Sequence, residues 1–473
     1  MKLPFLGGAY TGRSSNVSPE TCMNLFYEKG KSGECLVGSP GAVEFCDLGS
    51  GEVRGGIEYN NLAWFVRGNT LYSITSSGTA TSRGTLNTSS GRVSMAHNGT
   101  RTGANQQIFI ADGTQRYIYD NTTSTLTGYT DYAASQVVFI DGYFLFTITN
   151  SDQFYITSNM DGVTVDALDV STAEGSPDKI VALLADQREI FLFGEDSLEA
   201  WYDSGDVDNI FQRFQGGFSQ TGCAAAGTPQ KFDNSIIWLS KNARGHGQVV
   251  RLAEGYQPRI ISTPEVDYQI STYSTISDAF AYVYQDEGHE FYCLTFPTAK
   301  ATWVYDAATQ EWHRRGHTIS SVFPNRERYS CYIFAHGKHL LGDMDNGKIY
   351  YFDSTVGTMD GTAIPRERTT VSVSNEENRI RISSLQIDME EGTGNPNSST
   401  DKTFWLSYSK DGGHTYSDEV ARSIGDAGEY DTRLIWRRLG HARNWIFRVR
   451  TWTPNKVIIK GAIAKLYGEK RGD

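Results

Sequence analysis

The chain has 473 residues, a formal net charge of −12 and six cysteines. This length predicts two or three domains, and because no stretch reaches eighteen apolar residues, we expect no membrane-spanning helix. The cysteines are dispersed without the spacing of a zinc site, so we expect them to be reduced and structural.

The first fifty residues contain one good strand candidate, residues 22–28, with no apparent hairpin partner nearby. A strand with unpaired edges is costly or prone to aggregation. We therefore expect residues 1–50 to pair with a sheet formed by the C-terminal region. The first eight residues are too short and too broken in hydrophobicity for a secretory signal.

A strand-dense unit recurs about seven times between residues 53 and 356. Each unit has a run of alternating apolar and aromatic residues, a turn rich in Gly, Asp or Asn, and a second run, which indicates a β-hairpin. A recurrence every 40 to 50 residues, roughly, indicates radial repetition. The sequence predicts a β-propeller of about six or seven blades over residues 51–362. The first runs begin at Leu62, Gln107, Tyr143, Glu189, Ile236, Phe291 and Leu340.

Residues 363–473 lack this spacing and contain five or six strand candidates with one polar face, which describes a β-sandwich platform domain. The segment near residues 391–402 is polar and has too few apolar residues to pack, so we expect a mobile loop. Clear helices are few; one short helix is possible at residues 263–271.

Charge is distributed unevenly along the chain. Residues 366–473 hold 18 Lys and Arg against 15 Asp and Glu, so residues 1–365 carry a net charge of −15. Gripping nucleic acid requires cations, and an acidic repeat region instead suits a surface that nucleic acid passes without sticking. Ordinary solubility explains the same charge at least as well.

Residues 409–416 resemble the aspartate box of sialidases, with Tyr416 where tryptophan is usual. The box is a turn device in that family, and here it occurs once, outside the repeats, where it closes a hairpin. A glycosidase would also need a positioned pair of carboxylates or a tyrosine nucleophile with a base. The acidic residues are scattered at turns, so we expect no catalytic residues.

His336, His339, Asp343 and Asp345 form a candidate metal site by residue type and spacing. However, two histidines three residues apart on a strand face opposite sides. No phosphate loop, nucleophile elbow or dinucleotide fingerprint is found. We therefore expect neither a metal nor a cofactor.

One cluster near the C-terminus combines arginine with tryptophan, the residue types enriched in protein interfaces. We interpret it as a protein interface, although a solvated strand face or a stacking surface for single-stranded nucleic acid has the same composition. A regular strand would point Arg437 and Arg438 to opposite faces, and we expect charge reversal there to impair docking rather than folding. The candidate residues are Arg433, Trp436, Arg437, Arg438, Arg443, Trp445, Arg448 and Arg450.

Three segments, residues 56–60, 91–97 and 433–440, resemble the packaged-DNA stabilisation proteins of short-tailed phages, also called tail hub or tail accessory factor proteins. The similarity spans most of the chain. It implies a virion protein without catalytic residues that is assembled in the host cytoplasm and forms a homo-hexameric ring in the tail, below the portal and its adaptor ring.

The resemblance also implies the remaining partners. The hub would hold the tail needle or plug, contribute to tailspike attachment, and let double-stranded DNA pass its lumen without sequence-specific binding, while helping to retain the packaged genome. The alternative is a glycan-binding or sialidase-like propeller enzyme, because propellers and aspartate boxes recur in sialidases.

Overall fold

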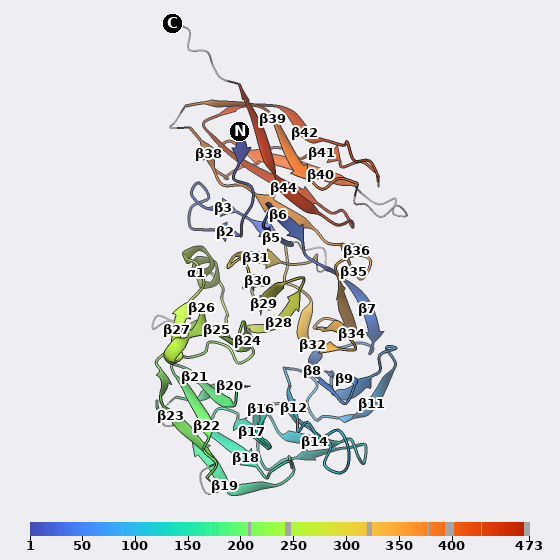
Figure 1. Cartoon of the computed structure of the whole chain (residues 1–473), viewed down its shortest axis with the longest axis vertical. Coiled ribbons are helices and arrows are strands. Elements are labelled where there is room, and N and C mark those ends of the chain that lie inside the picture. Colours follow the sequence, from blue (N-terminus) through green and yellow to red (C-terminus); the bar gives the residue numbers. More distant parts are fainter. Residues whose placement is uncertain are drawn as a thin grey trace.

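The computed structural model describes residues 1–173, 175–176, 178–206, 210–241, 247–318, 324–375, 378–392, 402–426 and 428–467. Figure 1 shows a ring-shaped β-propeller and, beside it, a β-sandwich that we call the platform. The predicted all-β class, with a propeller followed by a sandwich, is confirmed. Within the described residues, no helix has the length and apolarity needed to cross a membrane.

The described residues form seven blades of four antiparallel strands each. Blades 1 and 2 are β8 (Val53–Tyr59), β9 (Leu62–Arg67), β10 (Thr70–Ile74), β11 (Ala80–Thr85), and β12 (Ser94–His97), β13 (Gln107–Ala111), β14 (Arg116–Asp120), β15 (Thr125–Tyr129). Blades 3 and 4 are β16 (Ala134–Ile140), β17 (Tyr143–Ile148), β18 (Gln153–Thr157), β19 (Val165–Thr172), and β20 (Ile180–Asp186), β21 (Glu189–Gly194), β22 (Leu198–Asp203), β23 (Phe211–Ser219).

Blades 5 and 6 follow in the same order. They are β24 (Gln230–Phe232), β25 (Ser235–Lys241), β26 (Gly247–Ala253), β27 (Gln257–Ile260), and β28 (Phe280–Asp286), β29 (His289–Phe296), β30 (Ala301–Asp306), β31 (Trp312–Arg315). Blade 7 contains β32 (Tyr329–Ala335), β33 (Lys338–Asp343), β34 (Lys348–Asp353) and, from the N-terminal region, β7 (Gly41–Asp47). The seven predicted pairs of apolar runs correspond to the second and third strands of these blades.

The first hairpin of six blades closes with two residues that both have positive φ. Such a pair defines a type I′ turn, whose twist matches that of the flanking strands. Asparagine, aspartate and glycine tolerate this conformation best. The six turns are Asn60–Asn61, Asp141–Gly142, Gln187–Arg188, Asp233–Asn234, Glu287–Gly288 and His336–Gly337.

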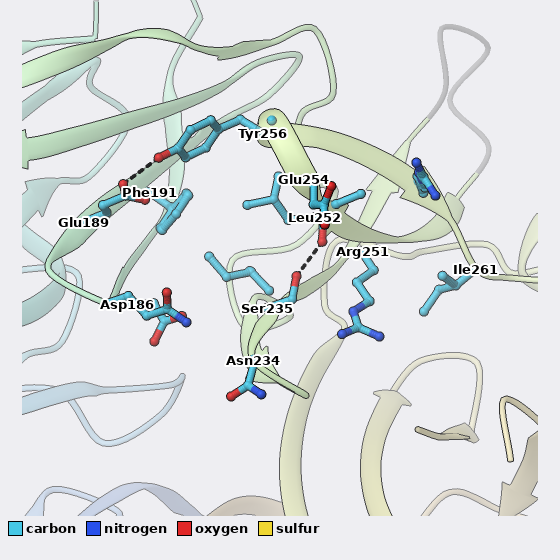
Figure 2. Close-up of a pocket in the computed structure, with 15 residues that line it drawn as sticks. Asp186, Glu189, Phe191, Asn234, Ser235, Arg251, Leu252, Glu254, Tyr256 and Ile261 are labelled. Atoms are coloured by element: carbon cyan, nitrogen blue, oxygen red, sulfur yellow. Dashed lines mark hydrogen bonds between the residues drawn. The ribbon is translucent and has the colours of Figure 1, made fainter. Parts of the chain in front are cut away.

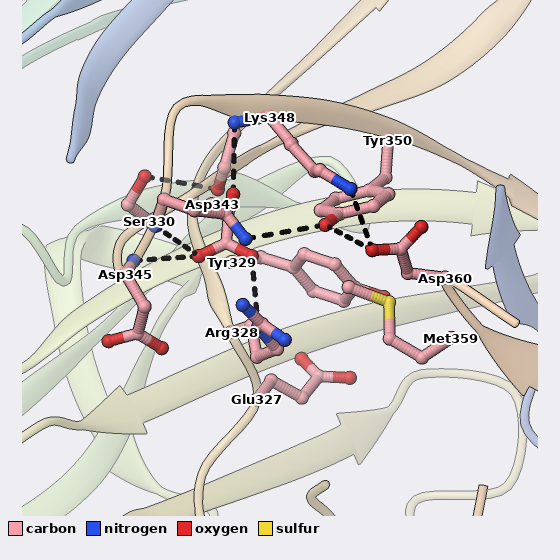
Figure 3. A network of polar contacts seen from close by, with 12 residues as sticks. Glu327, Arg328, Tyr329, Ser330, Asp343, Asp345, Lys348, Tyr350, Met359 and Asp360 are labelled. Atoms are coloured by element: carbon pink, nitrogen blue, oxygen red, sulfur yellow. Dashed lines mark hydrogen bonds and ion pairs between the residues drawn. The ribbon is translucent and has the colours of Figure 1, made fainter. Parts of the chain in front are cut away.

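The ring closes because β7 pairs antiparallel with β34 and becomes the outer strand of blade 7. Lys348 reinforces this closure through ion pairs to Glu44 of β7 (2.7 Å) and to Asp360 (2.9 Å; Figure 3). Hydrogen bonds to these two carboxylates raise the pKa of Lys348. We expected residues 1–50 to belong to the platform, but residues 41–47 form part of the propeller.

Side chains connect blades that are not neighbours in the ring. Arg92, which precedes the inner strand of blade 2, donates to the carbonyl oxygen of Ser330 in blade 7 (2.6 Å) and lies 4.6 Å from the ring centre of Phe280 in blade 6. From blade 3, Gln136 donates to the carbonyl oxygen of Ala226 (2.9 Å) and accepts from the amide of Leu183 in blade 4 (2.6 Å). These contacts connect blade 2 to blades 6 and 7, and blade 3 to blade 4 and to the segment before blade 5.

The platform consists of two sheets. One has the order β42-β39-β44-β6-β5, with β1 also on β44; the other has the order β4-β37-β43-β40-β41, with β38 also on β43. Their bounds are β1 (Lys2–Leu3), β4 (Cys22–Met23), β5 (Leu25–Lys29), β6 (Glu34–Gly38), β37 (Arg366–Thr369), β38 (Val373–Ser374), β39 (Ile380–Met389), β40 (Thr403–Ser409), β41 (Val420–Ser423), β42 (Leu434–Ala442), β43 (Asn444–Thr451) and β44 (Ile458–Tyr467).

The N-terminal strands pair with the platform as follows. β1 and β6 both pair with β44, and β4 pairs with β37. The expectation that residues 22–28 have no local hairpin partner is wrong, because β5 forms an antiparallel hairpin with β6. β6 then carries this hairpin onto the C-terminal sheet.

Propeller and platform share both a sheet and a core. The outer strand of blade 6, β31, pairs parallel with β4, so one continuous sheet runs from the blade into the platform. A single apolar cluster contains Trp303 and Trp312 of blade 6 together with Trp436 and Trp445 of the platform. The two domains therefore form one structural unit.

Few elements lie outside the blades and the sandwich. The predicted short helix is α1 (Pro264–Ser271), and its N-cap Thr263 accepts a hydrogen bond from the amide of Val266. The other short elements are β2 (Tyr10–Thr11), β3 (Pro19–Glu20), the 3₁₀ turn η1 (Glu254–Tyr256), β35 (Thr358–Met359) and β36 (Thr362–Ala363). All six cysteines are free thiols.

Candidate interface on the outer face of the platform

The two tryptophans of the predicted interface belong to the platform core. Trp436 is 1% exposed and Trp445 is fully buried. Their indole nitrogens donate to the carbonyl oxygens of Val420 (2.6 Å) and Ile380 (3.2 Å), respectively. Buried tryptophans normally satisfy their N–H in this way. They hold the two sheets together and offer no surface to a partner.

Two of the predicted arginines are engaged within the chain. The guanidinium of Arg448 lies 3.9 Å from the ring centre of Tyr416, and its Nε donates to Ser407 Oγ (3.1 Å). Arg450 forms ion pairs with Glu367 (2.6 Å) and Glu419 (3.2 Å). Both side chains are half-buried, so their positive charge is largely committed to internal partners.

The other four arginines, Arg433, Arg437, Arg438 and Arg443, are exposed, and none forms an ion pair with a described residue. The expectation that Arg437 and Arg438 face opposite sides is wrong. The register of β42 against β39 shifts at this point, and Arg438 has a φ of 64°. A bulge re-aims the side chains, so both arginines reach solvent.

The register places further cations beside them. Ser384 of β39 pairs with Arg437 on one side and with Lys465 of β44 on the other. Residues directly opposite in an antiparallel sheet share a face, so these three side chains form a row across the sheet. In another row, Gln386 lies between Ile435 and Ile463, and Lys2 of β1 pairs with Ile463.

This outer surface, formed mainly by β42, β39 and β44, is predominantly cationic. Asp388, which is half-buried, is the acidic residue that β39 contributes to it. We refer to the surface as the basic face and define it by its exposed cations, Lys2, Arg381, Arg437, Arg438, Arg443, Lys460 and Lys465.

The other motifs singled out in the sequence are turn structures. Asp411 accepts hydrogen bonds from the hydroxyl of Ser409 and from the amide and hydroxyl of Thr415, which lowers its pKa well below the usual range. These bonds shape the connection between β40 and β41, as expected for a hairpin turn. The loop expected to be mobile, near residues 391–402, falls almost entirely outside the described residues.

The residues considered for a metal site have separate partners. His336 Nε2 lies 3.1 Å from the carbonyl oxygen of Ile74, and His339 Nδ1 lies 2.9 Å from the hydroxyl of Tyr332. Figure 3 shows Asp343 accepting from the amide of Asp345 (2.6 Å). Within the described ranges no group of three or more His, Cys, Asp and Glu is placed to hold a metal.

A cleft of about 790 Å³ lies between blades 4 and 5 (Figure 2). Tyr256 spans its upper side and donates from its hydroxyl to Glu189 (2.5 Å). Burial, and then the hydrogen bond to Glu189, raise the pKa of Tyr256 to about 12.

Exposed aromatic and apolar residues extend from this cleft. The rings of Tyr202 and Phe214 lie 6.3 Å apart, and those of Phe214 and Tyr256 lie 5.1 Å apart. Phe214 is 40% exposed, and Ile260 on the outer strand of blade 5 is 56% exposed. The three rings form one aromatic surface beside the exposed Ile260, and exposed apolar patches are typical of interaction sites. We call these four residues the seam.

Comparison with known proteins identifies the family. A model of the bacteriophage P22 Gp10 β-propeller matches residues 1–357, and a model of the P22 Gp10 β-sandwich matches residues 365–466. The chain belongs to the bacteriophage P22 Gp10 family. This is the family of phage packaged-DNA stabilisation proteins, so the resemblance seen in the sequence is confirmed. The family model does not say which surfaces meet a partner.

Solved structures are only distantly similar, and no curated protein matches the chain. The designed Ika8 protein has 11% identity and a TM-score of 0.36 over 66% of this chain and 99% of that chain. PorZ of Porphyromonas gingivalis has 10% identity and a TM-score of 0.38, and the match covers 73% of this chain and 44% of PorZ. The extracellular domain of BT4673 from B. thetaiotaomicron, a putative one component system, has 12% identity and a TM-score of 0.43 over 92% and 61%. This chain therefore spans less than two thirds of the last two.

Membership in the P22 Gp10 family makes this chain a structural protein of the phage virion, located in the tail. Sequence reasoning missed the basic face as a unit, because Lys2, Arg381 and Lys465 lie far from the arginine cluster along the chain. The signal that could have found it is the alternation of polar with apolar residues in residues 380–387, together with the two lysines on the exposed side of residues 458–466.

Proposed function

We propose that this protein is the hub of the phage tail, with six copies forming a ring beneath the portal and its adaptor ring. The ring would form part of the DNA channel, hold the tail needle or plug, contribute to tailspike attachment and help to retain packaged DNA. Family membership supports a structural role in the tail, and the hexamer and its partners are our proposal.

The observation that supports a hub best is the continuous sheet from blade 6 through β4 into the platform. A protein that transmits load between the head and the tail tip needs domains that do not rotate against each other. Domains linked only by a flexible linker move by default, whereas a shared sheet and a shared core prevent such rotation.

Contacts between blades that are not neighbours support a channel formed by several copies. The side chains of Arg92 and Gln136 donate to carbonyl oxygens of Ser330 and Ala226 and so connect such blades. We therefore place the channel for DNA between subunits and not through one propeller. Cyclic assembly of identical copies is the ordinary way to build one.

The seam supports contact with another protein. Tyrosine and phenylalanine are enriched at interfaces, where they supply large contact areas. The seam lies on the propeller, away from the platform, so it leaves the basic face available to a different partner. We propose that it is one of the surfaces through which the hub contacts a neighbouring tail component.

The proposal is tested by native mass spectrometry and negative-stain imaging of the full chain, alone and with the portal–adaptor complex. A six-membered ring on the adaptor is the expected result. A chain that stays monomeric with the adaptor complex present would overturn the hub. Hydrolysis of a sialoside by the purified chain would instead favour the glycan-directed alternative.

A further inference from the structure

The basic face is unusual for this protein because residues 1–365 carry a net charge of −15. Its arginines and lysines come from β1, β39, β42, β44 and the turn after β42. These strands are separate in sequence and are brought together by their register. Arg437 and Lys465, in particular, stand on either side of Ser384 and form no ion pair with a described residue.

The composition of the basic face differs from that of a protein interface. Interface cores are depleted in lysine and charge and rely on aromatic anchors. Here Trp436, the large aromatic residue of β42, points into the core. β39 contributes Ser384 between Arg437 and Lys465, and Gln386 between Ile435 and Ile463. Surfaces that bind double-stranded DNA are more polar and far more positive than protein interfaces.

The side chains also distinguish between parts of a nucleic acid. Serine, glutamine, arginine and lysine are the usual donors to phosphate oxygens. Binding of unpaired bases relies on exposed aromatic rings for stacking, and the described side chains of β39 and β42 present no exposed Phe, Tyr or Trp on this face. A flat sheet also cannot enter a groove as a helix or a narrow ribbon does.

We propose that the basic face binds the phosphate backbone of double-stranded DNA, without sequence preference. This inference rests on the proposed hub, because it assigns the face to the side of the ring that meets the genome. The acidic propeller disfavours contact with DNA elsewhere on the chain. The charge distribution therefore favours one orientation of the subunit, with the basic face towards the DNA. Such contacts release counterions, and the affinity must fall steeply with salt.

The test measures fluorescence anisotropy of a labelled 20-base-pair duplex with the full chain between 50 and 200 mM salt. The double variant Arg437→Glu/Lys465→Glu removes two cations of one row. We expect at least a tenfold loss of affinity at 50 mM salt and a salt slope smaller by about 2, because each lost phosphate contact lowers the slope by about 1.

The matched control is Lys179→Glu/Arg188→Glu, which makes the same charge change on exposed propeller residues. We expect it to lose less than threefold. Equal losses in the two variants, or no binding by the unmodified chain at 50 mM salt, would overturn the proposal. If the platform variant keeps DNA binding but loses contact with another protein, the face is a protein interface and the proposal is also wrong.

Assembly of the same preparations, measured by native mass spectrometry, separates the two proposals. If the unmodified protein forms an intact ring but does not bind the duplex, the proposed DNA contact is wrong and the proposed hub is unaffected. A chain that binds the duplex through this face but stays monomeric with the portal–adaptor complex present would overturn the hub instead.

Discussion

Nη1 of Arg368, in the platform strand β37, donates a hydrogen bond of 2.6 Å to the carbonyl oxygen of Gly8, 360 residues earlier in the chain. Nε of the same side chain donates to the carbonyl oxygen of Phe5 (2.7 Å), and Nη1 also reaches that of Thr21 (3.2 Å). Arg368 is 1% exposed. One buried guanidinium therefore fixes the N-terminal segment onto the platform.

Replacing Arg368 with methionine keeps the volume of the side chain and removes its donors. Each buried carbonyl left without a donor costs about 1–3 kcal/mol, so we expect the free energy of unfolding to fall by about 3 kcal/mol or more. Urea denaturation measures this change. The exposed Arg437→Met is the control and should stay within about 0.5 kcal/mol of the unmodified protein; equal effects would contradict the role of Arg368.

Mutations in the Arg/Trp cluster should lower the stability of the fold when they remove a tryptophan and leave it unchanged when they replace an exposed arginine. Trp445→Ala creates a cavity between the two sheets and should cost about 3–5 kcal/mol. Arg437→Glu/Arg438→Glu changes exposed side chains and should leave the melting temperature near that of the unmodified chain. Thermal melts followed by circular dichroism decide this, and a large drop for the arginine variant would show that those side chains have partners in the fold.

Acid should destabilise the junction between blade 6 and the platform. Burial, and then the neighbouring Arg328, lower the pKa of His317 to about 3, and burial and Arg315 lower that of His313. Because an unfolded histidine titrates near 6.5, the unfolded state binds more protons below that pH. Stability from His317 is complete above about pH 6.5 and is lost as the pH falls towards 3.

The slope reaches about 1.4 kcal/mol per pH unit for each buried neutral histidine. Melting temperatures between pH 7.5 and 4.5 measure it. His317→Phe keeps an aromatic ring next to Tyr329 and should flatten the profile over this range. An unchanged profile in this variant would show that His317 is not the titrating group.

Changes in residues 1–38 and in β7 should destabilise different domains, the platform and the propeller respectively. Deleting residues 1–38 removes strands that pair with β37 and β44, so hydrogen exchange should increase in these platform strands more than in blades 1–5. Val43→Pro places a proline in β7 opposite Tyr351 and should raise exchange in β34. Identical exchange patterns in the two proteins would contradict this division.

The seam should matter for association and not for folding. Tyr202→Ser/Phe214→Ser replaces two exposed rings, so its free energy of unfolding should stay within about 0.5 kcal/mol of the unmodified chain. If the seam is a contact surface, the variant should bind its tail partner at least tenfold more weakly, because aromatic anchors cost about 2 kcal/mol when truncated. Co-sedimentation with tail complexes measures this loss, and full binding would remove the seam from the set of contacts.

The middle strands of the blades were predictable because they are buried on both faces. β9 and β21 read as nearly unbroken apolar runs, and this burial follows from packing between neighbouring blades. The outer strands β11 and β27, with sequences ATSRGT and QPRI, escaped detection because they are largely exposed. Their pairing depends on the strand beside them and not on their own hydrophobicity.

A second repeat is present in the sequence. Four blades end their third strand with an aromatic residue followed by aspartate, and each aspartate accepts a hydrogen bond from the amide two residues later at 2.7–3.0 Å. Aspartate forms such turns readily. The pairs are Tyr119–Asp120, Tyr202–Asp203, Tyr305–Asp306 and Phe352–Asp353.

The candidate site was harder to predict because composition does not reveal to which face of a strand each side chain points. Trp436 points into the core and Arg437 into solvent, as alternation in a strand requires, but composition alone does not say which face is which. The bulge at Arg438 then breaks the alternation, so Arg438 also reaches solvent. Lys465 joins Arg437 only through pairing across β39, and this non-local register could not be read from either segment alone.

The closure of blade 7 determines when the propeller can close during synthesis on the ribosome. β7 leaves the exit tunnel early, but its partner β34 follows about 300 residues later, so the N-terminal strand waits without a partner for most of synthesis. An exposed strand edge that waits this long is open to capture by another nascent chain. Neighbouring ribosomes on one messenger RNA are the nearest source of such chains, and slow translation therefore increases the risk of misassembly.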